Sequence, residues 1–162
     1  MLSDLIHRIR LLFCKERESY LRFYRILGFY PRRLKYYEQA LLHKSTAVRS
    51  DQGRLLNNER LEFLGDAILD AVVGDIVYRH FEGRREGFLT NTRSKIVQRE
   101  TLNKLAVEIG LDKLVKTSSR SQSHNSYLYG NAFEAFIGAI YLDRGYDCCM
   151  QLLKSGATFT PI

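Results

Sequence analysis

The apolar residues of this chain recur at helical spacing. The longest periodic stretch runs from Glu59 to Phe81, where apolar side chains follow one another at intervals of three and four residues. No segment bounded by turn residues alternates apolar and polar positions as a half-buried strand would. Pro31 and Pro161 are the two prolines of the sequence, so little interrupts long helices. The pattern therefore predicts an all-α fold.

Glycine and polar stretches divide this pattern into separate helices. Glycine often follows the last residue of a helix, and Ser-rich or Asn-rich runs favour loops. Helices are expected at residues 19–27, 34–44, 59–81, 89–109 with a break near Arg99, 127–142 and 147–154. Polar loops are expected at residues 50–58 and 116–125.

The two ends of the chain are expected to lie outside the main domain. Residues 1–20 have a helical apolar pattern that charged residues interrupt, so neither a secretory leader nor a membrane span is expected. Packing on the domain is favoured for this stretch over docking on a membrane. The chain of 162 residues suits one sizeable core. We therefore expect a helical extension at 1–20, one domain at 21–154 and a short tail at 155–162.

Composition adds a preference for a partner and a compartment. The 25 Lys and Arg residues outnumber the 18 Asp and Glu residues, giving a formal charge of +7 and a pI near 9.4. Such an excess favours a polyanionic partner such as nucleic acid without proving one. The three cysteines, Cys14, Cys148 and Cys149, form no Cys-x-x-Cys pair. A reduced, cytoplasmic chain is the expectation.

Three acidic residues punctuate the start of the longest helical stretch. Glu59, Glu62 and Asp66 are separated by three, four and seven positions, which places them on one helix face. Like charges stacked in this way repel one another. A cation should compensate, either a basic side chain such as Arg60 or Arg93 or a hard metal ion that prefers oxygen ligands.

A second acidic position lies in the apolar stretch near the C-terminus. Asn131 and Glu134 share one helix face, and an unpaired Glu134 would be costly so close to the core. The small residues Ala135, Gly138 and Ala139 would let the helix with Glu62 and Asp66 approach closely. Ordinary surface charge would explain any one of these acids but not the set. The chain has no Glu-x-x-His pair and no metal-ligand spacing of histidines, so oxygen ligation of Mg²⁺ or Mn²⁺ is favoured.

The residues around these acids resemble the ribonuclease III family. The family signature Asn-Glu-Arg-Leu-Glu-Phe-Leu-Gly-Asp is reproduced from Asn58 to Asp66. Residues 39–45 resemble the upstream His-Lys-Ser block of the family, and residues 134–143 resemble its downstream Glu-Ala-x-Ile-Gly-Ala-x-Tyr-Leu-Asp block. The resemblance spans roughly residues 23–146 and implies an all-α, homodimeric endonuclease domain.

The resemblance also implies roles for individual residues. Glu62, Asp66 and Glu134 would be the catalytic carboxylates of a Mg²⁺ site in which Mn²⁺ can substitute, and Glu59 would be a nearby acid of the cleft. Phe63 would be the apolar knob that fits into the partner subunit of the homodimer. For His43, Lys44 and Ser45 of the upstream block, a structural role in holding helices together is favoured over direct chemistry.

The activity implied by the resemblance is cleavage of double-stranded RNA. Metal-assisted hydrolysis of phosphodiesters would leave 5′-phosphate and 3′-hydroxyl ends, in the processing of ribosomal and messenger RNA. Because carboxylates repel RNA, basic residues should contact phosphates beside the acids. The candidates are Arg84, Arg85, Arg93, Lys95 and Arg99, with Arg79 a further one. The chain ends before the usual C-terminal double-stranded-RNA-binding domain, so a compact or shortened form is expected.

Asn131 departs from the family pattern, which has Asp at this position. An amide oxygen can still bind a hard metal ion, but the site loses one negative charge. Three interpretations stay open: an enzyme that tolerates Asn, a weakened enzyme, and a module that binds RNA or dimerises without cutting.

Overall fold

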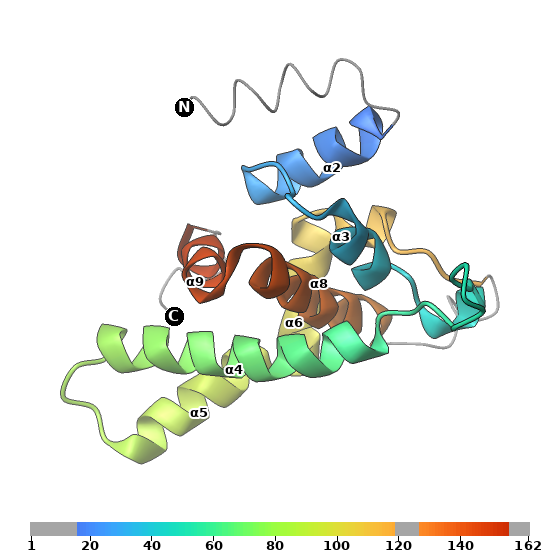
Figure 1. The fold of residues 1–162 in the computed structure, drawn as a ribbon. Helices are drawn as coiled ribbons and strands as arrows, with labels where there is room; N and C mark the ends of the chain where they lie inside the picture. The colour runs from blue at the N-terminus through green and yellow to red at the C-terminus, as the bar shows by residue number, and fades with distance from the viewer. Residues whose placement is uncertain (1–15, 119–126, 156–162) are drawn as a thin grey trace.

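The computed structural model describes residues 16–118 and 127–155 of the chain, and these form an all-helical domain (Figure 1). The helices are α2 (Arg17–Leu27), α3 (Leu34–Ala40), α4 (Glu59–His80), α5 (Glu86–Val97), α6 (Arg99–Glu108), α8 (Leu128–Arg144) and α9 (Tyr146–Ser155), with short 3-10 helices η1 (Lys44–Thr46) and η2 (Leu111–Lys113). Within the described ranges, β pairing is limited to the isolated bridges Leu42–Lys116 and Arg49–Leu55. The prediction of an all-α fold is confirmed.

Helix α8 forms the centre of the core. Its apolar side chains are buried on most of its circumference, because α3, α4, α6 and α9 all pack against it. Phe136 of α8 meets Tyr37 of α3 edge-on, with ring centroids 5.6 Å apart. Phe23 of α2 lies 5.5 Å from the same tyrosine ring. These three rings join the N-terminal helices to the core.

Two glycines bring α4 and α8 into backbone contact. A Cβ atom at Gly65 of α4 would overlap the backbone carbonyl of Glu134, and one at Gly138 of α8 would overlap the carbonyl of Leu61. The close approach predicted from the small residues of α8 is therefore confirmed, and α4 is the partner helix. This contact fixes the acids of α4 relative to Glu134.

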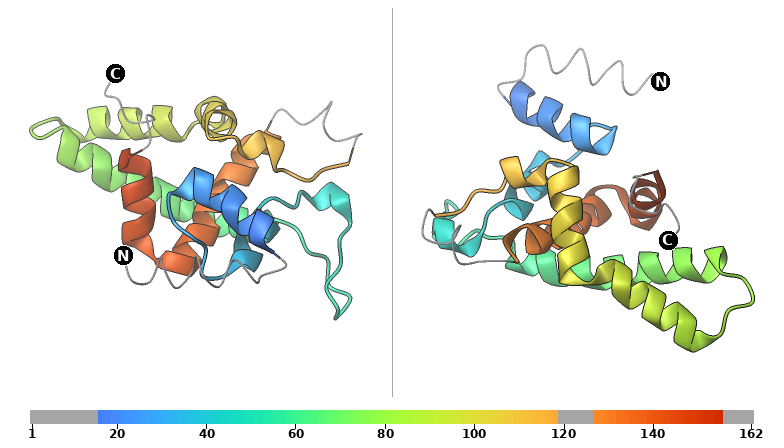
Figure 2. Two further views of the ribbon diagram at one scale, coloured as in Figure 1. Left: turned by 90° about the horizontal axis from the view of Figure 1, so that it is seen from above. Right: turned by 180° about the vertical axis from the view of Figure 1, so that it is seen from behind.

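The far end of α4 continues into a hairpin with α5. Figure 2 shows from two further directions that this hairpin extends away from the helices around α8. None of the residues of α5 is buried. Phe81 and Phe88 pack edge to face across the turn, with ring centroids 5.1 Å apart.

Most expected helix boundaries agree with the structure, and one is wrong. The helix expected at residues 34–44 ends at Ala40, because the chain turns to pair with the segment after η2. There the Lys116 N–H donates to the Leu41 carbonyl at 2.8 Å, and the His43 N–H donates to the Lys116 carbonyl at 3.0 Å. The expected break near Arg99 is confirmed at Gln98, between α5 and α6.

Several expectations concern residues that are not described. The proposed extension lies outside the described residues over 1–15, as do residues 119–126 of the polar loop and 156–162 of the tail. The domain boundaries at 20 and 154 stay predictions. In the described part of the chain, no helix is both long enough and apolar enough to span a membrane.

Candidate active site

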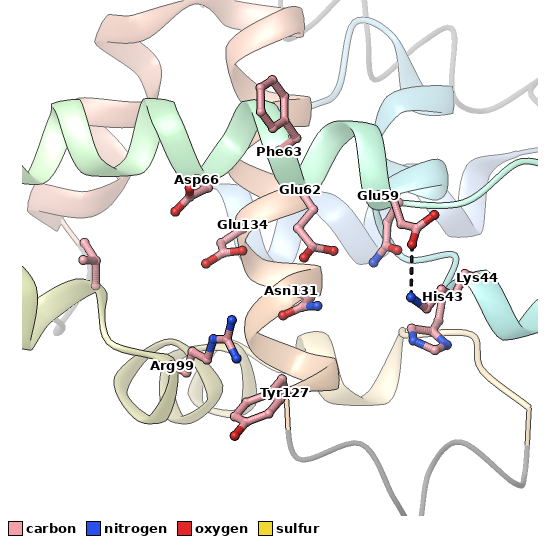
Figure 3. A pocket seen from close by; sticks show the side chains of 12 residues that line it. His43, Lys44, Glu59, Glu62, Phe63, Asp66, Arg99, Tyr127, Asn131 and Glu134 are labelled. Atoms are coloured by element: carbon pink, nitrogen blue, oxygen red, sulfur yellow. Dashed lines mark hydrogen bonds and ion pairs between the residues drawn. The ribbon is translucent and has the colours of Figure 1, made fainter.

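One cleft of about 650 Å³ contains the acidic residues expected to form a site (Figure 3). Helix α4 contributes Glu59, Glu62 and Asp66 to its wall, and α8 contributes Asn131 and Glu134. The remaining lining residues are His43, Lys44, Asn58, Phe63, Val97, Arg99 and Tyr127. The stripe expected from helical spacing and the second acidic position therefore face the same space.

The start of α4 is held in place by hydrogen bonds just before the first acid. The N–H of Asn58 donates to the Leu42 carbonyl at 2.8 Å, which ties the residue before the helix to the segment after α3. The N–H of Glu59 donates to the Asn57 side-chain oxygen at 3.1 Å, so an otherwise unpaired donor of the first helical turn is satisfied. These bonds set where the acidic stripe begins.

Burial and neighbouring acids raise the pKa of two carboxyls in the cleft, those of Glu62 and Glu134. Burial raises the pKa of the Glu134 carboxyl to about 7, and the nearby charges of Asp66 and Glu62 add to the effect. Burial also raises the pKa of Glu62, with a smaller contribution from Glu59, while a hydrogen bond with the Asn131 side chain opposes the rise. The cleft therefore favours either a bound proton or a bound cation.

Two basic residues lie close to these acids. Lys44 Nζ is 3.1 Å from Glu59 Oε1, an ion pair at the edge of the cleft. Arg99 acts on the other side, where its charge opposes the rise in the pKa of both Glu62 and Glu134. Of the two residues suggested from the sequence for this compensation, Arg93 instead lies 3.5 Å from Asp70. That suggestion was wrong for Arg93, because it pairs with Asp70, one helical turn beyond Asp66, and does not line the cleft.

The donor set of the cleft suits a hard divalent cation. Glu62, Asp66 and Glu134 offer carboxylate oxygens and Asn131 an amide oxygen, which are the ligands that Mg²⁺ and Mn²⁺ prefer. Across the described residues, no three acidic, histidine or cysteine side chains already stand close enough to hold an ion. The chemistry of the donors therefore fits, and closing around an ion requires side-chain rotation.

The five predicted RNA-binding residues are dispersed in the structure. Arg99 lines the cleft, whereas Arg93 and Lys95 lie on α5, and Arg84 and Arg85 lie in the turn between α4 and α5. Helix α4 has 22 residues, so that turn is about 33 Å from its first residue. The structure thus brings one of the five to the acids, and the binding role of all five stays a prediction.

The upstream His-Lys-Ser block divides into two parts. His43 Nδ1 lies 2.9 Å from Ser45 Oγ, which lies 3.1 Å from Thr117 Oγ1 and accepts the Ser118 N–H at 3.0 Å. These bonds agree with the expected structural role, because they join the segments after α3 and η2. Lys44 differs, since it points into the cleft and pairs with Glu59.

The sequence did not identify Tyr127 as a residue of the site. This residue immediately precedes α8, and the centroid of its ring lies 4.6 Å from the guanidinium carbon of Arg99. A tyrosine beside an apolar helix is ordinarily a core residue, and no motif marks this one. Its place one helical turn before Asn131 was the available signal.

The comparisons with known proteins agree with the geometry. A family model described as ribonuclease-III-like matches residues 34–157. Over 154 residues the chain is 81% identical to ribonuclease 3 of Bacteroides fragilis, covering 95% of this chain and 53% of that protein. It is 79% identical to ribonuclease 3 of Bacteroides thetaiotaomicron, over 95% of this chain and 50% of that protein. The chain therefore spans about half the length of the curated relatives it matches.

Solved structures give the same assignment. The nuclease domain of ribonuclease III from Campylobacter jejuni superposes with a TM-score of 0.72 at 30% identity, covering 82% of this chain and 92% of that one. Dicer from Pichia stipitis gives a TM-score of 0.57 at 31% identity, over 78% of this chain and 56% of that one. With its helical fold, its acidic cleft and these matches, the chain belongs to the ribonuclease III family.

Proposed function

We propose that this chain acts as an endoribonuclease that hydrolyses phosphodiesters of double-stranded RNA with the help of a divalent ion. The observation that carries the proposal is the position of Glu62, Asp66 and Glu134 on the wall of one cleft. Products with 5′-phosphate and 3′-hydroxyl ends, and a role in processing ribosomal and messenger RNA, are part of the same proposal. The relatives named ribonuclease 3 support it.

Each residue of the cleft has a task in this proposal. Glu62, Asp66 and Glu134, with the amide oxygen of Asn131, would hold Mg²⁺ or Mn²⁺. A bound divalent ion supplies a Lewis acid that lowers the pKa of water and offsets charge on a phosphate. Because the pKa of Glu134 is about 7 without an ion, binding of the ion near neutral pH displaces a proton from this carboxyl. Lys44 holds Glu59 at the cleft edge.

Asn131 sets how strongly the site binds its ion. A unit charge about 4 Å from the ion is worth up to ~4 kcal/mol at intermediate dielectric, and rearrangement of water and neighbours lowers the net loss. The hydrogen bond with Asn131 favours the charged form of Glu62. We infer an active enzyme with a raised requirement for the ion. A module that binds without cutting is the alternative that the Asn131 departure favours.

A homodimer is also part of the proposal. Phe63 stands beside the acidic row with 81% of its surface exposed, an unusual position for so apolar a side chain. The Campylobacter jejuni nuclease domain has a region involved in dimer formation. We expect Phe63→Glu to convert a dimer into monomers in sedimentation velocity, because burying a charge in the interface is costly. An unchanged sedimentation coefficient would exclude Phe63 from the interface.

Cleavage of a long RNA duplex in Mg²⁺ tests the central proposal. We expect the wild-type chain to cut, Glu134→Gln to lose about 100-fold or more in rate, and Asn131→Asp to gain severalfold. Equal rates in the wild type and Glu134→Gln would exclude the carboxylate mechanism. Cleavage by Asn131→Asp but not by the wild type would establish the binding module instead.

Binding of Mn²⁺, followed by electron paramagnetic resonance without RNA, provides a readout independent of activity. Asn131→Asp should bind Mn²⁺ about tenfold more tightly than the wild type, because it restores a charge in the donor set. Glu134→Gln should bind more weakly. Arg22→Gln, on α2 outside the cleft lining, should match the wild type.

A further inference from the structure

The cleft wall opposite the acids has an arginine held against an aromatic ring. Arg99 is the first residue of α6, and its guanidinium carbon lies 4.6 Å from the centroid of the Tyr127 ring, just before α8. Figure 3 shows the guanidinium between this ring and the carboxylate of Glu134. We propose that Arg99, positioned by Tyr127, binds a backbone phosphate of the RNA strand that enters the cleft. The inference rests on the proposed function, since RNA is taken as the ligand.

The charge of Arg99 is available to a ligand. In the described part of the chain Arg99 forms no ion pair within 4.0 Å, although its charge partly opposes the rise in the pKa of Glu62 and Glu134. Lys44, the other basic residue of the cleft, is already paired with Glu59 at 3.1 Å. Arg99 is therefore the better candidate of the two to meet an incoming anion.

The contact with Tyr127 leaves N–H donors of Arg99 for a ligand. A guanidinium has five N–H donors, and a contact with one aromatic ring cannot occupy all of them. Two parallel N–H donors match the geometry of a phosphate. The ring also restricts the side chain before binding, so less conformational entropy is lost when the phosphate arrives.

A hydrogen bond between α6 and α8 fixes the position of Arg99 relative to Tyr127. The side-chain oxygen of Asn103 on α6 accepts the N–H of Gly130 on α8 at 2.6 Å. Arg99 lies one helical turn before Asn103, and Tyr127 lies three residues before Gly130. The start of α6 and the start of α8 are therefore held together where Arg99 contacts Tyr127.

The placement explains how a polyanion can enter an acidic cleft. A row of carboxylates repels the RNA backbone, and one cation on the facing wall provides the compensating attraction. The acids and Arg99 would then contact different parts of the same strand. The competing explanation is that Arg99 balances the charge of the acids and touches no RNA.

Salt dependence of duplex binding separates these explanations. Anisotropy of a labelled RNA duplex would be measured across salt concentrations, in metal-free buffer, for the wild type, Arg99→Gln, Tyr127→Leu, Tyr127→Phe and the control Arg22→Gln. Arg99→Gln should bind about tenfold more weakly, since one phosphate contact is lost. The slope of log affinity against log salt concentration should also become smaller in magnitude by about one. Tyr127→Leu should weaken binding severalfold, and Tyr127→Phe should retain wild-type affinity because it keeps the ring.

The outcomes distinguish this inference from the proposed function. If Arg99→Gln matches Arg22→Gln in affinity and slope while the wild type still cuts RNA in Mg²⁺, the phosphate role is overturned and the enzyme proposal stands. If the wild type binds but does not cut, the enzyme proposal fails and the slope alone decides the role of Arg99. If the wild type neither binds the duplex in metal-free buffer nor cuts it in Mg²⁺, both fall. Adding Tyr127→Leu to Arg99→Gln should cause no further loss, because Tyr127 acts through Arg99.

Discussion

Helix α4 packs against two helices of opposite character. Against α8 it makes a backbone contact that two glycines permit, and α8 is buried along most of its length. Against α5 it makes contacts through partly exposed side chains, and α5 has no buried residue. Close backbone contact fixes the position of side chains far more tightly than contact through long polar side chains.

The difference matches the chemistry of the two regions. The acids lie at the α4–α8 contact, where several oxygen donors must converge on one point. The basic residues of the α4–α5 hairpin, such as Arg84 and Arg85, would meet a backbone with many equivalent phosphates, so approximate placement is enough. The two helices pack tightly where oxygen donors from both must converge on one ion.

A methyl group at the α4–α8 contact should have the largest effect. Gly65→Ala places its Cβ on the Glu134 carbonyl, a backbone atom that cannot move without displacing α8. We expect the free energy of unfolding to fall by about 3 kcal/mol or more in urea denaturation. Any folded variant should also lose RNA cleavage, because Glu134 shifts with its helix.

The hairpin provides the matched control. Gly87 lies inside α5 with no atom within 4 Å of the position of an added Cβ. Gly87→Ala should leave stability unchanged or raise it by up to about 1 kcal/mol, because alanine favours a helix. An equal loss of stability in both variants would show that the effect of Gly65→Ala does not come from the α4–α8 contact.

The sequence allowed the tight region to be predicted far better than the loose one. Glu62, Asp66 and Glu134 followed from helical spacing, which holds within any one helix, and from the family signature. Small residues of α8 correctly indicated close packing on α4. Arg93 was assigned to the wrong partner, because a pairing across α4 and α5 depends on how two helices are rotated toward each other. The role of Tyr127 depends in the same way on where α6 begins relative to α8.

The end of α3 shows the same limit on prediction. The apolar pattern continues to Lys44, yet the helix ends at Ala40 because the chain pairs with Lys116, more than seventy residues later. A local pattern cannot contain this information. The family signature compensated for such gaps only where it covered the residues concerned.

Removing the charge of Glu134 should change the free energy of unfolding less than Gly65→Ala does, and should raise it. Its pKa is about 7 in the folded chain against an ordinary 4.5, so the folded chain retains a proton that the unfolded chain releases earlier. Raising the pH through this interval therefore destabilises the fold. In metal-free buffer at about pH 8, Glu134→Gln should be more stable than the wild type by about 1–2 kcal/mol, discounted for the half-exposed carboxyl. At about pH 4 the difference should vanish, because both forms are uncharged.

Glu82→Gln is the matched control for this substitution, because Glu82 is exposed in the turn between α4 and α5. It should leave stability unchanged at both pH values, since no crowded charge is removed.

Excess Mg²⁺ should stabilise the wild type and Glu82→Gln but stabilise Glu134→Gln much less, because a ligand that binds only the folded state raises stability according to its affinity. If Glu134→Gln were instead less stable than the wild type at about pH 8, the ionised Glu134 would be held by favourable contacts. Crowded acids at the α4–α8 contact would then not lower the stability of the fold. The two contacts of α4 would differ in their steric packing, if the glycine substitutions show it, but not in their electrostatic cost.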